Sequence, residues 1–159
     1  MSAPLFVPLI LAVLIGAVAG SRTLLAPAAV SWAAYVGWLD VSGSWLFFMG
    51  HPVSPWVFTV LAALELVADK LPTTPSRKLP FPFASRIAAG AIAGATIVAG
   101  SGGGPWAAGL IAGGLGAVAG TLGGYAARMR MARAFGRDRP AALIEDAVAL
   151  AAALLIVAA

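Results

Sequence analysis

The chain has 159 residues, of which 61% are hydrophobic and only 10% are charged, with a net charge of +4. A soluble domain typically carries about 25% charged residues, so this composition excludes an ordinary soluble domain, a disordered chain and a nucleic-acid-binding module. Cysteine is absent and His51 is the only histidine, which excludes thiol catalysis, disulfides and histidine-based metal clusters. We expect one domain, residues 1–159, whose surface faces mostly lipid.

Six apolar segments approach the length that a helix needs to cross a bilayer core of about 30 Å. The second and third segments are short, and each could be tilted, broken or re-entrant. The sequence therefore predicts an all-α, polytopic transmembrane helix bundle of about six spans, or of five spans plus a re-entrant segment. The segments are residues 4–20, 23–39, 55–69, 84–100, 105–127 and 140–158.

The basic residues predict an orientation in the membrane. With six spans, all ten Lys and Arg residues fall on one side, in Arg22 and in the loops 70–86 and 128–139. The positive-inside rule makes this side cytoplasmic in a bacterial inner membrane, with both termini outside. Binding of anionic lipid headgroups is an alternative role for the basic loops. Four tryptophans are expected at the opposite, outer interface: Trp38, Trp45, Trp56 and Trp106.

Three predicted spans precede the 70–86 loop and three follow it with the opposite orientation, which is the arrangement of a 3+3 inverted repeat. Glycines spaced four residues apart recur in several spans. In lipid, such spacing lets helix backbones approach closely. Packing within one chain is one interpretation, and a homodimer interface is the other. The pairs are Gly16/Gly20, Gly90/Gly94, Gly109/Gly113, Gly116/Gly120 and Gly120/Gly124.

Four carboxylates lie inside or at the cytoplasmic ends of predicted spans. Glu65 and Asp69 share one helix face because they are four residues apart. Glu145 and Asp146 follow Pro140 in the last span and project about 100° apart. Charges within membrane helices cost about 2.5–3.5 kcal/mol at the centre and usually mark ion paths, proton relays or ligand sites. We therefore expect a proton or cation site toward the cytoplasmic side, with fixed salt bridges as the alternative.

Arg22 stands in a minimal turn between two apolar segments. It could pair with the carboxylates or hold a carboxylate or phosphate group. Together with Lys70, Arg77 and Arg86, it could bind an anionic lipid headgroup. Glu65 and Asp69 could instead hold a hard cation through their oxygens. No cofactor is expected, and the chain lacks a Ser-His-Asp set, a P-loop and a dinucleotide fingerprint, so we do not expect an enzyme.

These residues together resemble a known family. The shared elements are Gly20-x-Arg22, Glu65-x-x-x-Asp69-Lys70-x-Pro72, Ser85-Arg86 before a Gly-rich helix, and Glu145-Asp146. In this order they resemble the bacterial membrane family catalogued as domain of unknown function 4126, over nearly the whole chain. The resemblance implies an integral membrane protein of several helices and supplies no activity. The chain lacks the histidine that the resemblance implies near residues 125–127.

A local similarity to undecaprenyl-diphosphate phosphatases involves two elements. One begins at Glu65 and continues through Asp69 to Pro72 and two threonines, and the other is Gly20-Ser-Arg-Thr23. In those enzymes, acidic residues act with a divalent cation beside a Ser/Arg phosphate pocket. In this chain the order of the two elements differs and the motif histidine is absent, so the similarity implies at most a shared way of holding phosphate.

The sequence thus predicts a small transporter or channel-like protein whose partners are membrane lipids and a small ion or solute. Its site would be lined by Arg22 and the four carboxylates, with a proton or cation bound at Glu65 and Asp69. A lipid-phosphate-binding or flipping protein is one alternative, with metal-dependent chemistry on such a lipid left open. A non-transporting structural membrane protein is the other.

Overall fold

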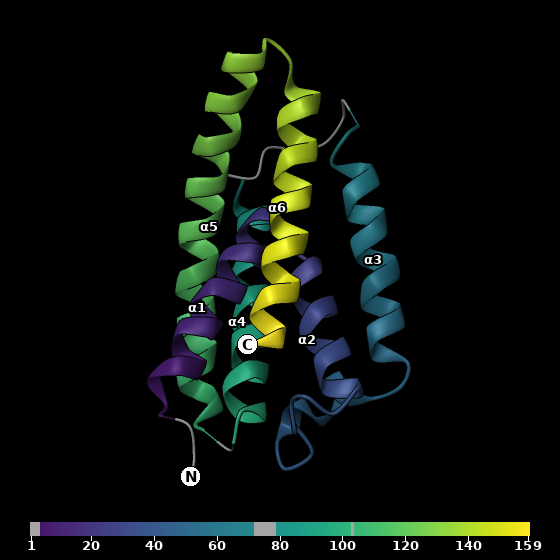
Figure 1. The fold of residues 1–159 in the computed structure, drawn as a ribbon, viewed down its shortest axis with the longest axis vertical. Coiled ribbons are helices and arrows are strands. Elements are labelled where there is room, and N and C mark those ends of the chain that lie inside the picture. The colour runs from purple at the N-terminus through teal and green to yellow at the C-terminus, as the bar shows by residue number, and fades with distance from the viewer. Residues whose placement is uncertain (1–3, 72–78, 103) are drawn as a thin grey trace.

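The computed structural model describes residues 4–71, 79–102 and 104–159. These residues form six α-helices and one short 3-10 helix, and no strand occurs among them, so the predicted all-α class is confirmed (Figure 1). Each of the six predicted segments overlaps one α-helix. The elements are α1 (Phe6–Ser21), α2 (Leu25–Tyr35), η1 (Trp45–Gly50), α3 (Ser54–Ala68), α4 (Pro80–Gly100), α5 (Trp106–Phe135) and α6 (Asp138–Ala158).

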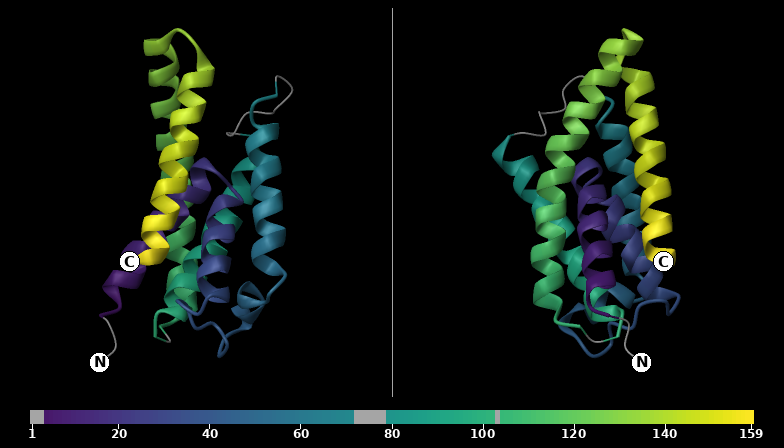
Figure 2. Two further views of the ribbon diagram at one scale, coloured as in Figure 1. Left: turned by 45° about the vertical axis from the view of Figure 1, so that its right-hand side comes forward. Right: turned by 60° about the vertical axis from the view of Figure 1, so that its left-hand side comes forward.

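The helices differ in how far they extend. Among the described residues, α4, α5 and α6 are long and apolar enough to cross a membrane, whereas α1 and α3 are apolar but shorter. The 11 residues of α2 span about 17 Å, which is less than a bilayer core of about 30 Å. The turn between α1 and α2 lies below the upper ends of α5 and α6 (Figure 1, Figure 2). Helices α1 and α2 therefore form a hairpin whose turn lies inside the bundle. The number of membrane spans stays an expectation.

Glycines bring α1, α4 and α5 into backbone contact. A Cβ atom added to Gly113 on α5 would clash with the carbonyl oxygen of Gly90 on α4, and one added to Gly16 on α1 would clash with the carbonyl of Gly113. Gly116 and Gly120 face carbonyl oxygens of α1 in the same way. Helices that approach this closely gain dispersion contacts along their backbones. The glycine pairs therefore allow close helix packing within one chain, which is the first of the two interpretations drawn from the sequence.

The packing does not support the predicted inverted repeat. The fifth helix lies against both α1 and α4, whereas α2, its counterpart in the first half, packs chiefly against α3. These counterparts also differ in length, with 11 residues in α2 and 30 in α5. The two halves of the chain thus contribute unequally to the helix packing. Helix α5 packs between α1 and α4, whereas α2 is too short to occupy an equivalent position.

The two ends of the bundle differ in chemistry. At one end, Trp45 of η1 and Trp106 of α5 pack edge to face with ring centroids 5.6 Å apart, and Trp32 packs against Trp56 at 5.0 Å. The charged side chains described below gather toward the other end, where α3 finishes and α6 begins. Tryptophans and basic residues are therefore separated as expected from the sequence, whereas the orientation in a membrane stays an expectation.

Large apolar side chains cover the outer faces of α3 and α6. A contiguous apolar surface is unfavourable in water and suits a protein or lipid partner. The exposed residues include Val60, Leu64 and Val67 on α3, and Val148, Leu154 and Leu155 on α6.

Two glycines on α5 allow a matched test of this packing. We expect Gly113→Ala to lower the melting temperature of the purified protein, since overpacking of this kind costs about 1–3 kcal/mol. Gly123 has open space where a Cβ would stand, so Gly123→Ala should leave stability unchanged or raise it, because alanine favours helices by about 1 kcal/mol over glycine. Equal effects of the two substitutions in a thermal unfolding assay would contradict the proposed helix contacts.

Candidate functional site

Arg22 occupies the turn between α1 and α2, inside the bundle. Its backbone N–H donates to the carbonyl oxygen of Val18 (2.7 Å), and its extended backbone ends α1. Contact between Gly20 and α5 holds this turn against the bundle, and Arg22 is only 1% exposed. A guanidinium stays charged in proteins, and a buried charge is tolerated only beside partners. The fold must therefore bring anionic groups to this turn.

Three carboxylates from two segments supply that negative charge. Asp69, which directly follows α3, forms an ion pair with the Arg22 guanidinium. Asp146 on α6 accepts a hydrogen bond from Nε of Arg22 at 2.5 Å, and Oε2 of Glu145 lies 3.6 Å from Nη2. Glu145 and Asp146 project in different directions from α6, yet both reach Arg22 because a guanidinium presents donors along several edges.

Glu65 has a different role in the structure. Its two carboxylate oxygens accept hydrogen bonds from the backbone N–H groups of Thr23 (2.7 Å) and Leu24 (2.8 Å). These residues directly precede α2, where backbone N–H groups lack partners within the helix and a negative charge is favoured. Glu65 on α3 therefore caps the start of the neighbouring helix α2, and it lies one turn before Asp69.

Arg86 on α4 makes the complementary contact at the end of α1. Its Nη1 atom donates to the carbonyl oxygens of Gly20 (2.7 Å) and Ser21 (2.9 Å), which lie at the negative end of the α1 dipole. Its Nη2 atom is 4.0 Å from the Glu65 carboxylate. Arg86 is 4% exposed, so it faces the interior. Arg86 and Glu65 together hold the two sides of the α1–α2 turn.

Lys70 and Arg128 complete the charge cluster at its rim. The Lys70 ammonium lies 2.7 Å from Oδ2 of Asp146. Arg128 on α5 donates two hydrogen bonds to Asp138, at 3.0 and 2.6 Å. Its Nη1 atom lies 3.5 Å from Glu145 and 3.9 Å from Asp69. We use the name Arg22 cluster for Arg22, Asp69, Glu145 and Asp146 with these two cations.

The structure thus brings all four predicted carboxylates to one region. Each lies within 4.0 Å of at least one cation, so the predicted acidic site is also a network of ion pairs. Arg77, which the sequence placed among the headgroup-binding residues, lies outside the described residues. Within residues 4–71, 79–102 and 104–159, no group of three or more His, Cys, Asp or Glu residues could hold a metal ion.

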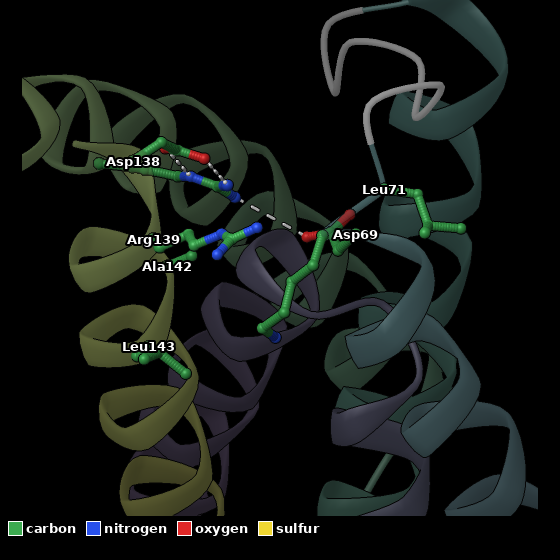
Figure 3. Close-up of a pocket in the computed structure, with 8 residues that line it drawn as sticks. Asp69, Leu71, Asp138, Arg139, Ala142 and Leu143 are labelled. Atoms are coloured by element: carbon green, nitrogen blue, oxygen red, sulfur yellow. Dashed lines mark hydrogen bonds and ion pairs between the residues drawn. The ribbon is translucent and has the colours of Figure 1, made fainter.

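A cavity of about 400 Å³ adjoins the cluster between the end of α3 and the helices α5 and α6 (Figure 3). Asp69 forms part of its wall, so one carboxylate belongs to both the cluster and the cavity. Figure 3 shows Arg139 extending from α6 toward Asp69 across this space. The lining residues are Asp69, Lys70, Leu71, Arg128, Asp138, Arg139, Ala142 and Leu143.

Sequence reasoning missed the structural role of Arg128. It grouped this residue with the other arginines of the 128–139 loop, whereas α5 continues through this stretch and carries Arg128 to Glu145 and Asp138. One signal was present: Arg128 is the first basic residue after the apolar run of α5, and Asp138 is the acidic residue that opens α6. A charge that closely follows an apolar run is the one placed to meet a partner at the helix end.

The fold and the site together define an all-helical bundle, with helices suited to crossing a membrane and with a buried arginine shared by carboxylates near one end. The chain belongs to the family described as Domain of unknown function (DUF4126), whose model matches residues 9–159. This match confirms the resemblance seen in the sequence. No curated protein and no solved structure matches the chain.

Removing the central cation tests the geometry of the cluster. We expect Arg22→Met to lower the free energy of unfolding by about 3–5 kcal/mol near neutral pH, because it strands buried carboxylates without their partner. The deficit should shrink as the pH falls from about 7 to about 4, where carboxylates can take up protons. Thermal unfolding over a pH series measures both effects.

Arg130 provides the control for this substitution. It is exposed and lies two residues from Arg128 on the same helix, so Arg130→Met should leave the unfolding curve nearly unchanged at every pH. An Arg22→Met protein that melts like the wild type, or a deficit that does not depend on pH, would contradict the ion pairs described for Arg22.

Proposed function

We propose that the chain is a small integral membrane transporter in which the Arg22 cluster is the gate. In this proposal a proton or a small cation opens the gate by binding to carboxylates of the cluster. One observation carries the proposal: a single buried guanidinium bridges Asp69, at the end of α3, and Asp146 on α6. In the part of the chain that the structure describes, α3 packs against α2 and η1 and makes no extensive contact with α5 or α6. Charge is therefore the main link between α3 and α6 at this end.

A proton or cation can weaken this link by a direct chemical route. Protonation of Asp69 or Asp146 removes a negative charge from Arg22, and a small cation can compete with Arg22 for the same oxygens. An ion pair at these distances contributes on the order of a few kcal/mol at an effective dielectric constant of about 20. A change of this size is sufficient to shift the populations of two conformations. Release of α3 would then open the adjoining cavity to one side of the membrane.

The contacts divide the predicted site into two parts. Glu65 and Arg86 hold the backbone of the α1–α2 turn, so we assign them a structural role within the transporter. Asp69, Glu145 and Asp146 contact Arg22 instead, and we propose them as the groups that exchange a proton or cation. In this proposal the cluster lies toward the cytoplasmic side of a bacterial inner membrane, as the basic loops predict.

A structural role without transport is the second candidate. It is favoured by the fact that every predicted carboxylate has a cationic partner within 4.0 Å. The lipid-phosphate alternative, in the form that used Arg22 and Arg86, has less support, since these two side chains face the interior and bind groups of the protein itself.

Proton flux in proteoliposomes distinguishes transport from a structural role. We expect the wild-type protein to dissipate an imposed pH gradient, measured with an enclosed pH-sensitive dye in the presence and absence of small cations. Asp146→Asn should abolish this flux while the protein stays folded, because the amide keeps the size of the side chain but cannot carry the charge.

Asp40 supplies a matched control at the opposite end of the helix bundle. Hydrogen bonds from the hydroxyl and backbone N–H of Ser42 hold the pKa of the Asp40 carboxyl below its usual value, and this residue is exposed and far from the Arg22 cluster in the fold. Asp40→Asn should retain wild-type flux. The proposal fails if wild-type protein shows no proton- or cation-dependent flux while Asp146→Asn only lowers the melting temperature, which is the outcome that a structural role predicts.

A further inference from the structure

The cavity beside the Arg22 cluster contains more positive than negative side chains. Its wall carries three cations, Lys70, Arg128 and Arg139, against two carboxylates, Asp69 and Asp138. The carboxylates are already engaged, since Asp69 binds Arg22 and Asp138 accepts two hydrogen bonds from Arg128. The negative charge of the wall is therefore satisfied by the protein, and the remaining charge in the cavity is positive.

Arg139 is the cation whose charge is left over. It makes no hydrogen bond or ion pair with any residue that the structure describes, unlike Arg22, Arg86 and Arg128. The side chain extends into the cavity rather than away from the bundle (Figure 3). Lys70 contributes further capacity, because its ammonium has three donors and its described contacts are Asp146 and the carbonyl oxygen of Leu66.

The remaining lining residues of the cavity are apolar. Leu71 follows α3, whereas Ala142 and Leu143 lie one turn into α6. Leu71 and Leu143 are also exposed, so the apolar lining reaches the surface of the molecule. A cavity of about 400 Å³ is within the range of small-molecule sites. The lining therefore combines donors for an anion with a surface for hydrocarbon.

We infer that this cavity is a binding site for a phosphate-type anion, with Arg139 as the residue that recognises it and Lys70 as a second donor. Arginine suits such a ligand because its fork of N–H groups matches two phosphate oxygens. The anion comes either from a soluble phosphate compound or from the headgroup of an anionic lipid, which would lay its chains against Leu71 and Leu143. Arg139 lies outside the Arg22 cluster, whereas Lys70 belongs to both the cluster and this site. The existence of the site does not depend on transport.

Binding to the purified protein tests the site without any flux measurement. The first arm titrates inorganic phosphate at constant ionic strength and follows the melting temperature, which a ligand of the folded state raises by mass action. The second arm compares nanodiscs of phosphatidylcholine alone with nanodiscs that contain phosphatidylglycerol. We expect a saturable rise in at least one arm, and Arg139→Gln should weaken the apparent affinity about tenfold or more, as loss of a charge-assisted hydrogen bond would.

Arg133→Gln is the matched control. Arg133 is an exposed arginine of α5 that does not line the cavity, so its loss removes the same charge without touching the site. Arg139→Lys should restore part of the affinity. A rise in the phosphate arm identifies a soluble ligand, and a rise in the phosphatidylglycerol arm alone identifies a lipid. The inference is overturned if neither arm shows a rise, or if Arg133→Gln weakens binding as much as Arg139→Gln. Either result leaves the proposed gate unaffected.

Discussion

The burial of the Arg22 guanidinium is the constraint on which the arrangement of this end of the molecule depends. A permanent positive charge with 1% exposure requires partners, because the cost of leaving it unpaired in a low-dielectric interior exceeds the whole stability of most domains. Asp69 and Asp146 meet that requirement from different elements. The position of α3 relative to α6 therefore follows from where the short turn between α1 and α2 places one side chain.

Close packing at glycines fixes Arg22 in the buried turn between α1 and α2. The backbones of α1, α4 and α5 touch at Gly16, Gly90 and Gly113, so the three helices form a rigid core in which the α1–α2 turn is fixed. The capping contacts from Arg86 and Glu65 then hold the two sides of the turn. By contrast, α3 packs against little besides α2 and η1. A rigid core beside a helix held by charge is an arrangement in which the state of a few carboxylates can set a conformation.

Much of this fold could be predicted from the sequence, because hydropathy and charge position act over whole segments. All six apolar segments became helices, and the glycine spacing indicated their close packing. The inverted repeat predicted from the sequence is not supported by the packing, since similar runs of glycine and alanine arise in helices with unequal roles. The residue at which α2 begins depends on the cap from Glu65. This cap is a contact between residues far apart in the chain.

The candidate site was likewise predicted only in part. Arg22 and the four carboxylates could be identified because a charge within an apolar segment is energetically costly, but their partners could not be identified. Glu65 and Asp69 share a helix face, yet one turn of separation gives them different neighbours, the backbone of α2 for one and Arg22 for the other. Arg128 and Arg139 look alike in the sequence, whereas the structure pairs the first and leaves the second directed into a cavity. Only the tertiary arrangement separates a structural arginine from one available to a ligand.

The central claim is that charge holds the end of α3 to α6, and a distance measurement tests it most directly. The chain has no native cysteine, so Val67→Cys on α3 and Val148→Cys on α6, both at exposed positions, can carry a pair of spin labels without a background signal. The account predicts a single short distance near neutral pH. It predicts a longer or broader distribution in acid, and the same change at neutral pH when Asp146→Asn is added. A distribution that stays the same under all three conditions would contradict it.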